Sequence, residues 1–519
     1  MLHPWLLAMF PVLFLYARNL GELDFGDVVY PLAASLALAV GLYLVLRLPV
    51  RSGQRRGLMV SCLITLFYSY ANIASAARSV LPLPPGRWAW PYYVIWLLIA
   101  AAALAVIARL KRSLPYWTKI LNVIALSLVV LNGVRIAAAV PDKLAVWKGD
   151  LTIPEPWQGP DLTAEAQRPN FFILVFDQHV GFPCLKRYGY DAGEFIDALR
   201  DRGFHVAENS TANYWMTPYA MAGLFNYTYL DFILDQIPEG FKGHQPAFKL
   251  TRDNRAFRFL KEAGYTTIQC HTDFLYAYEN IDNVDIRINP DRWYTTALSR
   301  ELISNTPLSL HTPVLLRRSI LSAFEETARL CRLDEPFIVF THFLSPHPPY
   351  VFDEQGHYPG PDSAFADFDV QFCADEDKRE LRLYLAEITY LHKRIIEMVD
   401  AIQANSKRPS VIILQGDHGN RLQVKHGQDR QLTPDAALEL FSILNAMYLP
   451  GVDPDGLPDA VSPVNTFRLV FDRYFGTDLG LLPDRCFYPG PSGRLFEDVT
   501  DLVLEGLKQT DSRRTLRPD

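Results

Sequence analysis

The sequence contains few cysteines, and none has the spacing of a metal-binding or redox pair. Six cysteines occur in 519 residues without a Cys-x-x-Cys pair, so neither a zinc finger nor a disulfide framework is expected. A chain of this length can bury a core without such cross-links. Cys184 is therefore interpreted as an ordinary buried thiol rather than a nucleophile.

The larger part of the chain lacks any excess of basic residues. Residues 1–150 carry 14 Lys and Arg against 5 Asp and Glu, whereas residues 151–519 carry 36 against 52. The resulting net charges are +9 and −16, so the two parts are expected to lie in different surroundings. An acidic region of this kind does not bind nucleic acid, and that class of partner is excluded.

The basic part of the chain is also the apolar part, which indicates a membrane domain. A helix needs about 20 apolar residues to cross the hydrocarbon core. The first of five apolar runs is shorter than this, but no basic segment or cleavage site marks it as a signal peptide. We therefore predict about five transmembrane helices within residues 1–142, from apolar runs at about 4–17, 28–47, 57–76, 91–109 and 119–140.

Basic residues in the loops predict how these helices are oriented. They gather after the second run and between the fourth and fifth runs, whereas the other connections are acidic or nearly neutral. The positive-inside rule places such loops in the cytoplasm. With an odd number of spans, the rest of the chain lies outside the inner membrane, as a proline-rich linker (143–168), a catalytic domain (169–508) and a disordered tail (509–519).

The region after residue 169 is predicted to have an α/β fold. Short buried strands alternate with amphipathic helices, which indicates a mostly parallel sheet covered by helices on both faces. The helical patterns lie at 194–202, 254–263 and 381–405. The strands are predicted at 171–176, 266–270, 337–340 and 411–414.

Polar residues follow each predicted strand where it ends. They are Asp177, His271, the pair His342 and His347, and the run Asp417-His418-Gly419. Open parallel sheets bind ligands beyond the carboxyl ends of their strands, so we expect these residues to converge. Asp177, Asp417 and His418 offer oxygen and nitrogen ligands that suit Zn²⁺ or Mn²⁺ better than Ca²⁺, with Mg²⁺ also possible. Alternatively, Asp-His-Gly is a turn with a capping carboxylate.

A hydroxyl group that could act as a nucleophile precedes a predicted helix. Thr217 lies next to Pro218 and is predicted to be the N-cap of that helix, whose first N–H groups would face a phosphate. A divalent cation lowers the pKa of a coordinated hydroxyl and so activates it for attack. The alternative is that Thr217 only caps the helix.

The ordered motifs resemble those of the alkaline phosphatase and sulfatase superfamily. The likeness covers most of the chain, and it is strongest to the membrane branch that includes lipoteichoic acid synthases and phosphoethanolamine transferases. The phrases that carry it are 210-STANYW-215, 346-PHPPYVFD-353, 416-GDHGNR-421 and 464-VNTFRLVFDRYF-475.

The resemblance implies a role for several individual residues. Asp177, Asp417 and His418 would bind one divalent metal ion, and Thr217 would be both a ligand and the nucleophile. His347 would bind the substrate phosphate or protonate a leaving group. A second group of histidines is left without an assigned role, with indirect or structural roles favoured for most of them: His179, His271, His342 and His426.

Two departures from the family pattern bear on the reaction. Gln178 and His179 follow the first aspartate, where phosphatase-like members commonly have Gly or Ser. Sulfatases carry Cys or Ser in a Cys/Ser-x-Pro-x-Arg pattern, whereas Met221 stands in the place of the Arg here and the nucleophile is a threonine. A threonine does not yield formylglycine, so cleavage of sulfate esters is not expected.

The sequence therefore predicts a membrane-bound phosphotransferase. It would move a phosphoglycerol- or phosphoethanolamine-type group from a membrane phospholipid to an envelope glycan or lipid, through a phospho-threonine intermediate. Two alternatives stay open. One is a phosphodiesterase, phosphatase or sulfuric ester hydrolase, and the other is a non-catalytic envelope scaffold anchored in the membrane.

Overall fold

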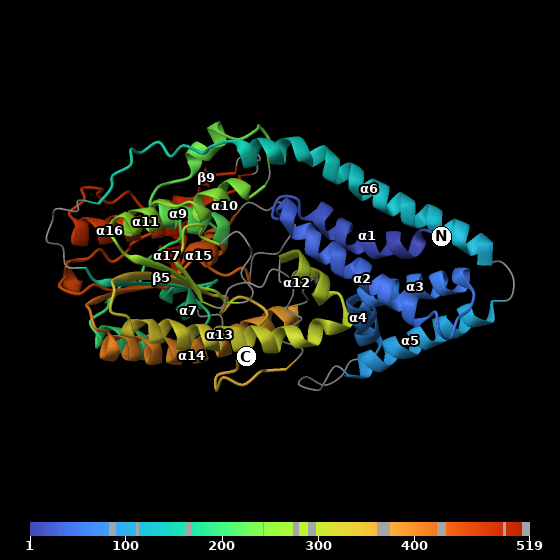
Figure 1. Ribbon diagram of the computed structural model, residues 1–519. Coiled ribbons are helices and arrows are strands. Elements are labelled where there is room, and N and C mark those ends of the chain that lie inside the picture. The colour runs from blue at the N-terminus through green and yellow to red at the C-terminus, as the bar shows by residue number, and fades with distance from the viewer. Residues whose placement is uncertain are drawn as a thin grey trace.

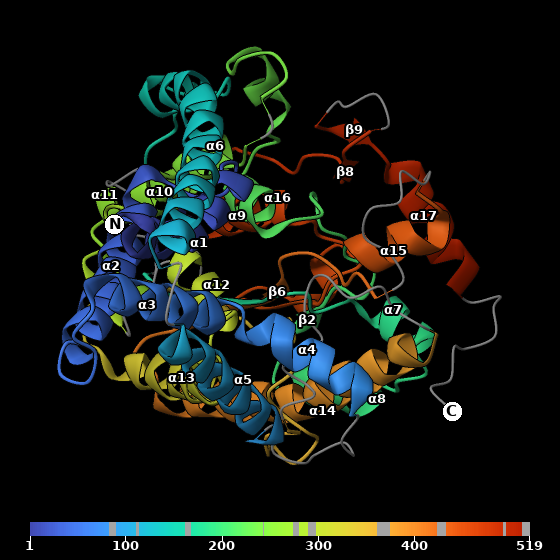
Figure 2. The same ribbon diagram turned by 90° about the vertical axis from the view of Figure 1, so that its right-hand side faces the viewer.

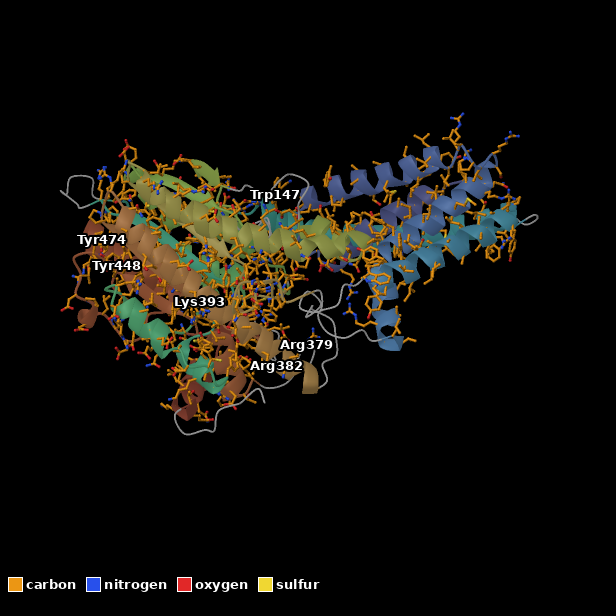
Figure 3. All side chains as sticks on the ribbon, turned by 90° about the horizontal axis from the view of Figure 1, so that it is seen from below. Trp147, Arg379, Arg382, Lys393, Tyr448 and Tyr474 are labelled. Atoms are coloured by element: carbon orange, nitrogen blue, oxygen red, sulfur yellow. The ribbon has the colours of Figure 1, made fainter. Side chains whose placement is uncertain are left out.

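The protein has a helical N-terminal part and a sheet-containing C-terminal part that pack end to end (Figure 1). The computed structural model describes residues 1–81, 90–110, 114–160, 168–241, 243–272, 280–288, 297–360, 374–422, 432–490 and 495–510. Figure 3 shows Trp147 at the junction of the two parts, whereas Tyr448 and Tyr474 lie at the end remote from the N-terminal helices.

Six helices make up the N-terminal part: α1 (His3–Arg18), α2 (Val29–Val45), α3 (Gly53–Tyr68), α4 (Tyr70–Val80), α5 (Trp90–Arg109) and α6 (Leu114–Lys148). Within the described residues, three helices are long and apolar enough to cross a membrane. They are α5, α6 and Phe25–Val45, which is α2 together with the short 3-10 helix Phe25–Val28 before it. Helices α3 and α4 pass the same test only as a pair, with a bend of 63° between them.

The number of candidate spans is thus three, or four with the bent pair, which is fewer than the five predicted. The difference lies in the first and third apolar runs. Helix α1 has only 16 residues, which corresponds to about 24 Å of helix. The third run breaks at Ser69, which separates α3 from α4. Helix α1 nevertheless packs inside the bundle, where Ala8 and Val12 are fully buried (Figure 2).

Helix α6 joins the two parts of the protein. It continues to Lys148, beyond residue 142 where the sequence predicts the linker to begin, and it contains Pro141. The ammonium group of Lys143 donates hydrogen bonds to the carbonyls of Leu20 and Leu23, in the loop that connects α1 to α2. The end of α6 therefore holds that loop in place.

The C-terminal part is built on a seven-stranded sheet in the order β2-β7-β6-β1-β5-β3-β4. Within the described part of this sheet, β7 runs in the opposite direction to the other six strands. All four predicted strands are present, and the predicted mostly parallel sheet is confirmed. The strands are β1 (Asn170–Phe176), β2 (His205–Val206), β3 (Thr266–Cys270), β4 (Ile286–Ile288), β5 (Phe337–Phe343), β6 (Ser410–Gly416) and β7 (Asn445–Tyr448).

Helices cover both faces of this sheet, as the sequence predicts. Alternate residues of β1 point to opposite sides, so Phe172 enters one apolar core and Phe171 enters the other. The first core is closed by α7 (Phe182–Arg187), α8 (Gly193–Arg200), α13 (Thr312–Arg329) and α14 (Ala374–Asn405). The second core is closed by α9 (Thr217–Asn226), α11 (Arg255–Glu262) and α16 (Pro463–Phe475).

The described part of the linker lies against the catalytic domain. Glu155 accepts two hydrogen bonds from the Nη2 of Arg468, at 2.5 and 2.6 Å. The Arg468 side chain is only 4% exposed, and its other N–H groups donate to the carbonyls of Tyr227, Leu479 and Gly480. At the other end of the chain, α17 (Thr500–Thr510) includes the first two residues of the predicted tail, and 511–519 lie outside the described residues.

This pairing predicts how a linker substitution affects stability. Replacing Glu155 with Gln weakens the partner of a buried cation, so we expect a loss of about 1–3 kcal/mol, seen as a lower melting temperature in detergent and faster proteolysis within residues 150–160. The matched control is Glu208→Gln, because the Arg200–Glu208 pair is exposed and contributes at most about 1 kcal/mol. Equal melting temperatures for the two variants would contradict the expectation.

Candidate active site

The candidate active site lies at the carboxyl ends of the central strands. Strand β1 pairs in parallel with both β5 and β6, and Phe176 stands opposite Phe343 on one side and Gly416 on the other. The next residues, Asp177 and Asp417, therefore leave the sheet at the same level. The predicted convergence of these two strand ends is confirmed.

Thr217 is held beside the two strand ends by the first turn of α9. The helix begins at Thr217, with Pro218 following it, and Met216 in an extended conformation is the N-cap. The prediction that Thr217 itself is the N-cap is wrong by one residue. Its hydroxyl is turned away from the helix backbone, and Oγ1 donates to Oδ2 of Asp417 at 2.7 Å and lies 3.3 Å from Nε2 of His418.

Backbone groups fix the orientation of Asp417. Its Oδ1 accepts hydrogen bonds from the N–H groups of Gln178, at 3.0 Å, and His418, at 2.8 Å. Gln178 adopts a left-handed conformation with φ of 61°, which is uncommon for a residue other than glycine. This turn directs the Gln178 N–H at Asp417, so a locally unfavourable backbone conformation serves the geometry of the site.

A second set of backbone contacts orients His418. The ring Nδ1 is 2.7 Å from the Gly419 carbonyl, so Nδ1 carries the proton and the unprotonated Nε2 is free to bind a metal ion beside Thr217 and Asp417. Gly419 is required at this turn, because a Cβ atom there would lie 2.0 Å from the carbonyl oxygen of Glu439.

The charges of the cluster suit a cation. Burial opposes ionisation of Asp417, but the electrostatic influence of the neighbouring imidazoles of His418 and His342, with the hydrogen bonds from Gln178 and Thr217, brings its pKa below the usual value. Burial lowers the pKa of His418, which keeps its ring neutral. A buried carboxylate next to a neutral imidazole is the protonation state in which both groups bind a metal ion.

Three side chains fit a single divalent metal ion. Asp177, Asp417 and His418 each offer one ligand atom, and these atoms lie within 4.8 Å of one another. The His418 Nε2 is 4.0 Å from Oδ1 of Asp177 and 3.4 Å from Oδ2 of Asp417. Two carboxylate oxygens and one imidazole nitrogen match the donors that Zn²⁺ and Mn²⁺ accept. The choice between these ions and Mg²⁺ stays a prediction.

His347 lies close to this cluster on a loop after β5. Burial lowers the pKa of its ring to about 4, and His418 and Asp417 lie close enough to contribute smaller electrostatic effects to this pKa. Its Nδ1 is 2.5 Å from the carbonyl oxygen of Pro348. The loop itself is anchored by the buried Glu387 of α14, whose carboxylate accepts from Ser345 Oγ at 2.7 Å and from two backbone N–H groups, those of Val351 and Phe352.

The remaining histidines have different environments. His342 Nε2 is 3.9 Å from Oδ2 of Asp177, too far for a hydrogen bond, and His271 is buried at the end of the neighbouring strand β3. His179 is turned toward His392 of α14, with 3.2 Å between their Nε2 atoms. His426 lies outside the described residues.

Two residues near the site were not identified from the sequence. Glu387 is buried within a long helical pattern that gives no sign of its role. Arg421 donates from Nη2 to the Trp215 carbonyl at 2.8 Å, and the charges of Asp177 and Asp417 act on its guanidinium. The position of Arg421 directly after the Asp-His-Gly-Asn run is the signal that could have identified it.

One family model matches part of the chain. The sulfatase family model matches residues 234–440, which confirms the predicted resemblance for that region. It includes His347, Asp417 and His418 but neither Asp177 nor Thr217. No curated protein sequence matches this chain.

Three solved structures are similar to this chain at low sequence identity. The lipooligosaccharide phosphoethanolamine transferase A (EptA) of Neisseria meningitidis is 13% identical, with 92% of this chain and 95% of that chain covered and a TM-score of 0.43. The periplasmic domain of EptC from Escherichia coli, in a complex with Zn, is 15% identical over 61% and 84% of the chains, with a TM-score of 0.40. The lipoteichoic acid synthase LtaP of Listeria monocytogenes is 15% identical over 72% and 97%, with a TM-score of 0.39.

The anchor of the His347 loop predicts a pH dependence of stability. Burial raises the pKa of Glu387 from 4.5 to about 7. The fold therefore favours the protonated carboxyl, and the free energy of unfolding falls as the pH rises from 4.5 to 7, by at most about 1.4 kcal/mol per pH unit. In Glu387→Gln, denaturation midpoints should lose this slope. Glu397→Gln, on the exposed side of the same helix, should keep it, and a slope that persists in Glu387→Gln would refute the assignment.

Proposed function

We propose that this chain, with its sulfatase-like region at residues 234–440, is a membrane-embedded phosphotransferase that uses Thr217 as its nucleophile. One observation carries the proposal. The Thr217 hydroxyl lies 2.7 Å from a carboxylate oxygen and 3.3 Å from an imidazole nitrogen of a cluster suited to a metal, at the start of a helix. A residue that served only as a cap would turn its oxygen to the helix backbone instead.

The reaction is a double displacement at phosphorus. The Thr217 oxygen attacks the phosphorus of a phospholipid headgroup, the bond to the diacylglycerol oxygen breaks, and the proton released by Thr217 ends on that oxygen, so diacylglycerol leaves as the alcohol. An acceptor hydroxyl then attacks the phosphorus of the phospho-threonine, the bond to the Thr217 oxygen breaks, and the acceptor's proton passes to Thr217. A divalent ion held by Asp177, Asp417 and His418 would lower the pKa of the hydroxyl and screen the phosphate charge. His347 would contact the phosphate or the leaving group through Nε2, since its Nδ1 is hydrogen-bonded to the carbonyl oxygen of Pro348.

Hydrogen bonds connect the nucleophile helix to the membrane part by way of His244, which supports a lipid donor. Tyr219, two residues after Thr217, is hydrogen-bonded through its hydroxyl to Nδ1 of His244 at 2.8 Å. The backbone N–H of His244 donates to the Gly21 carbonyl in the α1–α2 loop, also at 2.8 Å. These two hydrogen bonds therefore connect α9, through His244, to the α1–α2 loop of the membrane part. An envelope glycan or lipid with a hydroxyl is the proposed acceptor.

The catalytic domain is proposed to lie outside the inner membrane. Arg55, at the start of α3, donates from Nη2 to the Leu110 carbonyl at the end of α5, so the two basic loops meet at one end of the bundle. Helix α6 leads from that end to the catalytic domain at the other end (Figure 1). The positive-inside rule then places the catalytic domain outside the cytoplasm, whether or not α1 is counted as a span.

Substitution of the nucleophile tests the proposed reaction. Thr217→Ala should lower turnover of a chromogenic phosphodiester by about a thousandfold or more, because no other hydroxyl replaces it. Thr217→Ser should retain measurable activity, and metal content should be unchanged in both variants. After incubation with phospholipid vesicles, mass spectrometry should find the transferred group on Thr217 of the wild type. Full activity in Thr217→Ala would sink the proposal, whereas release of the group to water alone would make the protein a hydrolase.

Arg421 is proposed to bind the substrate phosphate. In the sulfatase pattern an arginine follows the nucleophile by four residues, but Met221 occupies that place here and is buried in the core. Arg421 supplies a guanidinium from the loop after β6 instead, beside the backbone of Trp215 and within the influence of Asp177 and Asp417. A charge-assisted hydrogen bond to phosphate would explain why this cation lies next to the catalytic residues.

The role of Arg421 predicts an effect on substrate binding. Arg421→Gln should raise KM for a phosphodiester about 10- to 100-fold, the loss expected for a hydrogen bond to a charged group, and Arg421→Lys should restore part of it. The control is Arg202→Gln, which also removes an arginine that donates to a backbone carbonyl, that of Ala198, but on the surface. A fall in melting temperature without a change in KM would indicate a structural role only.

A further inference from the structure

A segment of the catalytic domain, separate in sequence from the active-site residues, packs against the membrane helices and is called the turn below. It consists of α12 (Ala297–Ser304), the short helix η4 (Pro307–His311) and the start of α13. Two apolar residues of α12, Leu298 and Leu302, pack with Val12, Tyr16 and Leu23 of the membrane part. Figure 3 shows α13 running along the catalytic domain toward the N-terminal helices.

Hydrogen bonds connect this turn to two membrane helices. The Tyr93 hydroxyl, near the start of α5, donates to the Pro307 carbonyl. The backbone N–H of Ala71, at the start of α4, donates to the Asn305 carbonyl at 3.3 Å. The turn is therefore fixed at the level where α5 begins on the side of the catalytic domain.

Aromatic side chains mark that level as a membrane interface. Tyr93 lies against Tyr70, with ring centroids 4.7 Å apart, and Tyr70 also meets the edge of Trp96 at 6.1 Å. Trp90, at the first position of α5, is exposed. Tyrosine and tryptophan gather where the hydrocarbon core meets the headgroups, because their rings are apolar and their polar atoms stay hydrated.

The outer surface of the turn is apolar. Leu308, Val314 and Leu315 are 51%, 57% and 56% exposed, whereas Leu316 and Ile320 on the opposite side of α13 are fully buried. The exposed residues thus have no role in the core of the catalytic domain. The turn is joined to the start of α5 through the hydrogen bond from Tyr93, and α5 itself exposes Val94, Leu97 and Leu98. A basic residue, Arg318, is exposed one turn further along α13.

We propose that Leu308, Val314 and Leu315 insert into the membrane leaflet that faces the catalytic domain. The occupant of this apolar surface is lipid rather than another protein, because the turn is hydrogen-bonded to the start of α5, a candidate membrane-spanning helix, and lies at its aromatic level. Arg318 then meets the lipid phosphates, as a basic residue beside an inserted apolar edge does in interfacial helices. The insertion gives the catalytic domain a second point of attachment to the bilayer, separate from α6.

Fluorescence quenching by brominated lipids tests the insertion on the full-length protein in vesicles. An environment-sensitive fluorophore is attached at Leu315→Cys in a background with Cys62→Ala and Cys373→Ala, since the other cysteines are buried. The matched control is Leu333→Cys, which is also exposed but follows the opposite end of α13. Lipids brominated near the headgroup should quench the label at 315 at least threefold more than the label at 333.

Two results would overturn the proposal. Equal quenching at positions 315 and 333 would mean that the turn stays in water. Blue-shifted emission at 315 without quenching would mean that protein, such as a second copy of this chain, covers the surface. The measurement does not use catalysis, so it is unaffected if Thr217 proves not to be a nucleophile. A Val314→Ser, Leu315→Ser variant should lose the difference in quenching measured from a label at Leu308→Cys, and its melting temperature reports whether it folds.

Discussion

The parallel pairing of β1 with both β5 and β6 is the constraint on which the site depends. It brings Asp177 and Asp417 out of the sheet at one edge. The next residue, Gln178, donates its backbone N–H to Asp417, although 239 residues separate the two in sequence. Helix α9 adds Thr217 to the same place, and the Thr217–Asp417 hydrogen bond joins the second apolar core to the strand ends. A change in strand register would move each ligand to the opposite face of the sheet. The apolar residues that set the register therefore also set the chemistry.

Much of this arrangement could be predicted because its signals are local. Strands such as Phe171–Phe176 are continuous apolar runs, and the polar residue at each end is read directly from the sequence. The rule that ligands bind beyond parallel strand ends then grouped Asp177, Asp417 and His418 without any knowledge of strand order. The N-cap was misplaced by one residue because Met216, not Thr217, takes the extended conformation before Pro218, and a methionine gives no capping signal.

The features that escaped prediction depend on contacts between distant segments. Glu387 belongs to a helix whose pattern shows only its apolar side, and its partners are backbone N–H groups 35 and 36 residues away. The number of spans was overestimated because the first apolar run was counted despite its short length, and because apolar composition does not reveal the break at Ser69. His179 was left without a role because its contact is not local: its ring faces His392, and that contact follows from the packing of α14 on the sheet.

The unbroken length of α6 has a mechanical consequence. Its 35 residues extend about 52 Å. On the proposed topology about 30 Å of that length crosses the hydrocarbon core, so the remaining part of the helix projects from the bilayer toward the catalytic domain. Lys143 hydrogen-bonds this end of α6 to the α1–α2 loop, which limits movement of the helix relative to the other membrane helices. On the proposed function, the length of α6 beyond the bilayer therefore sets how far Thr217 lies from the membrane surface, and this distance limits which acceptors can present a hydroxyl to it.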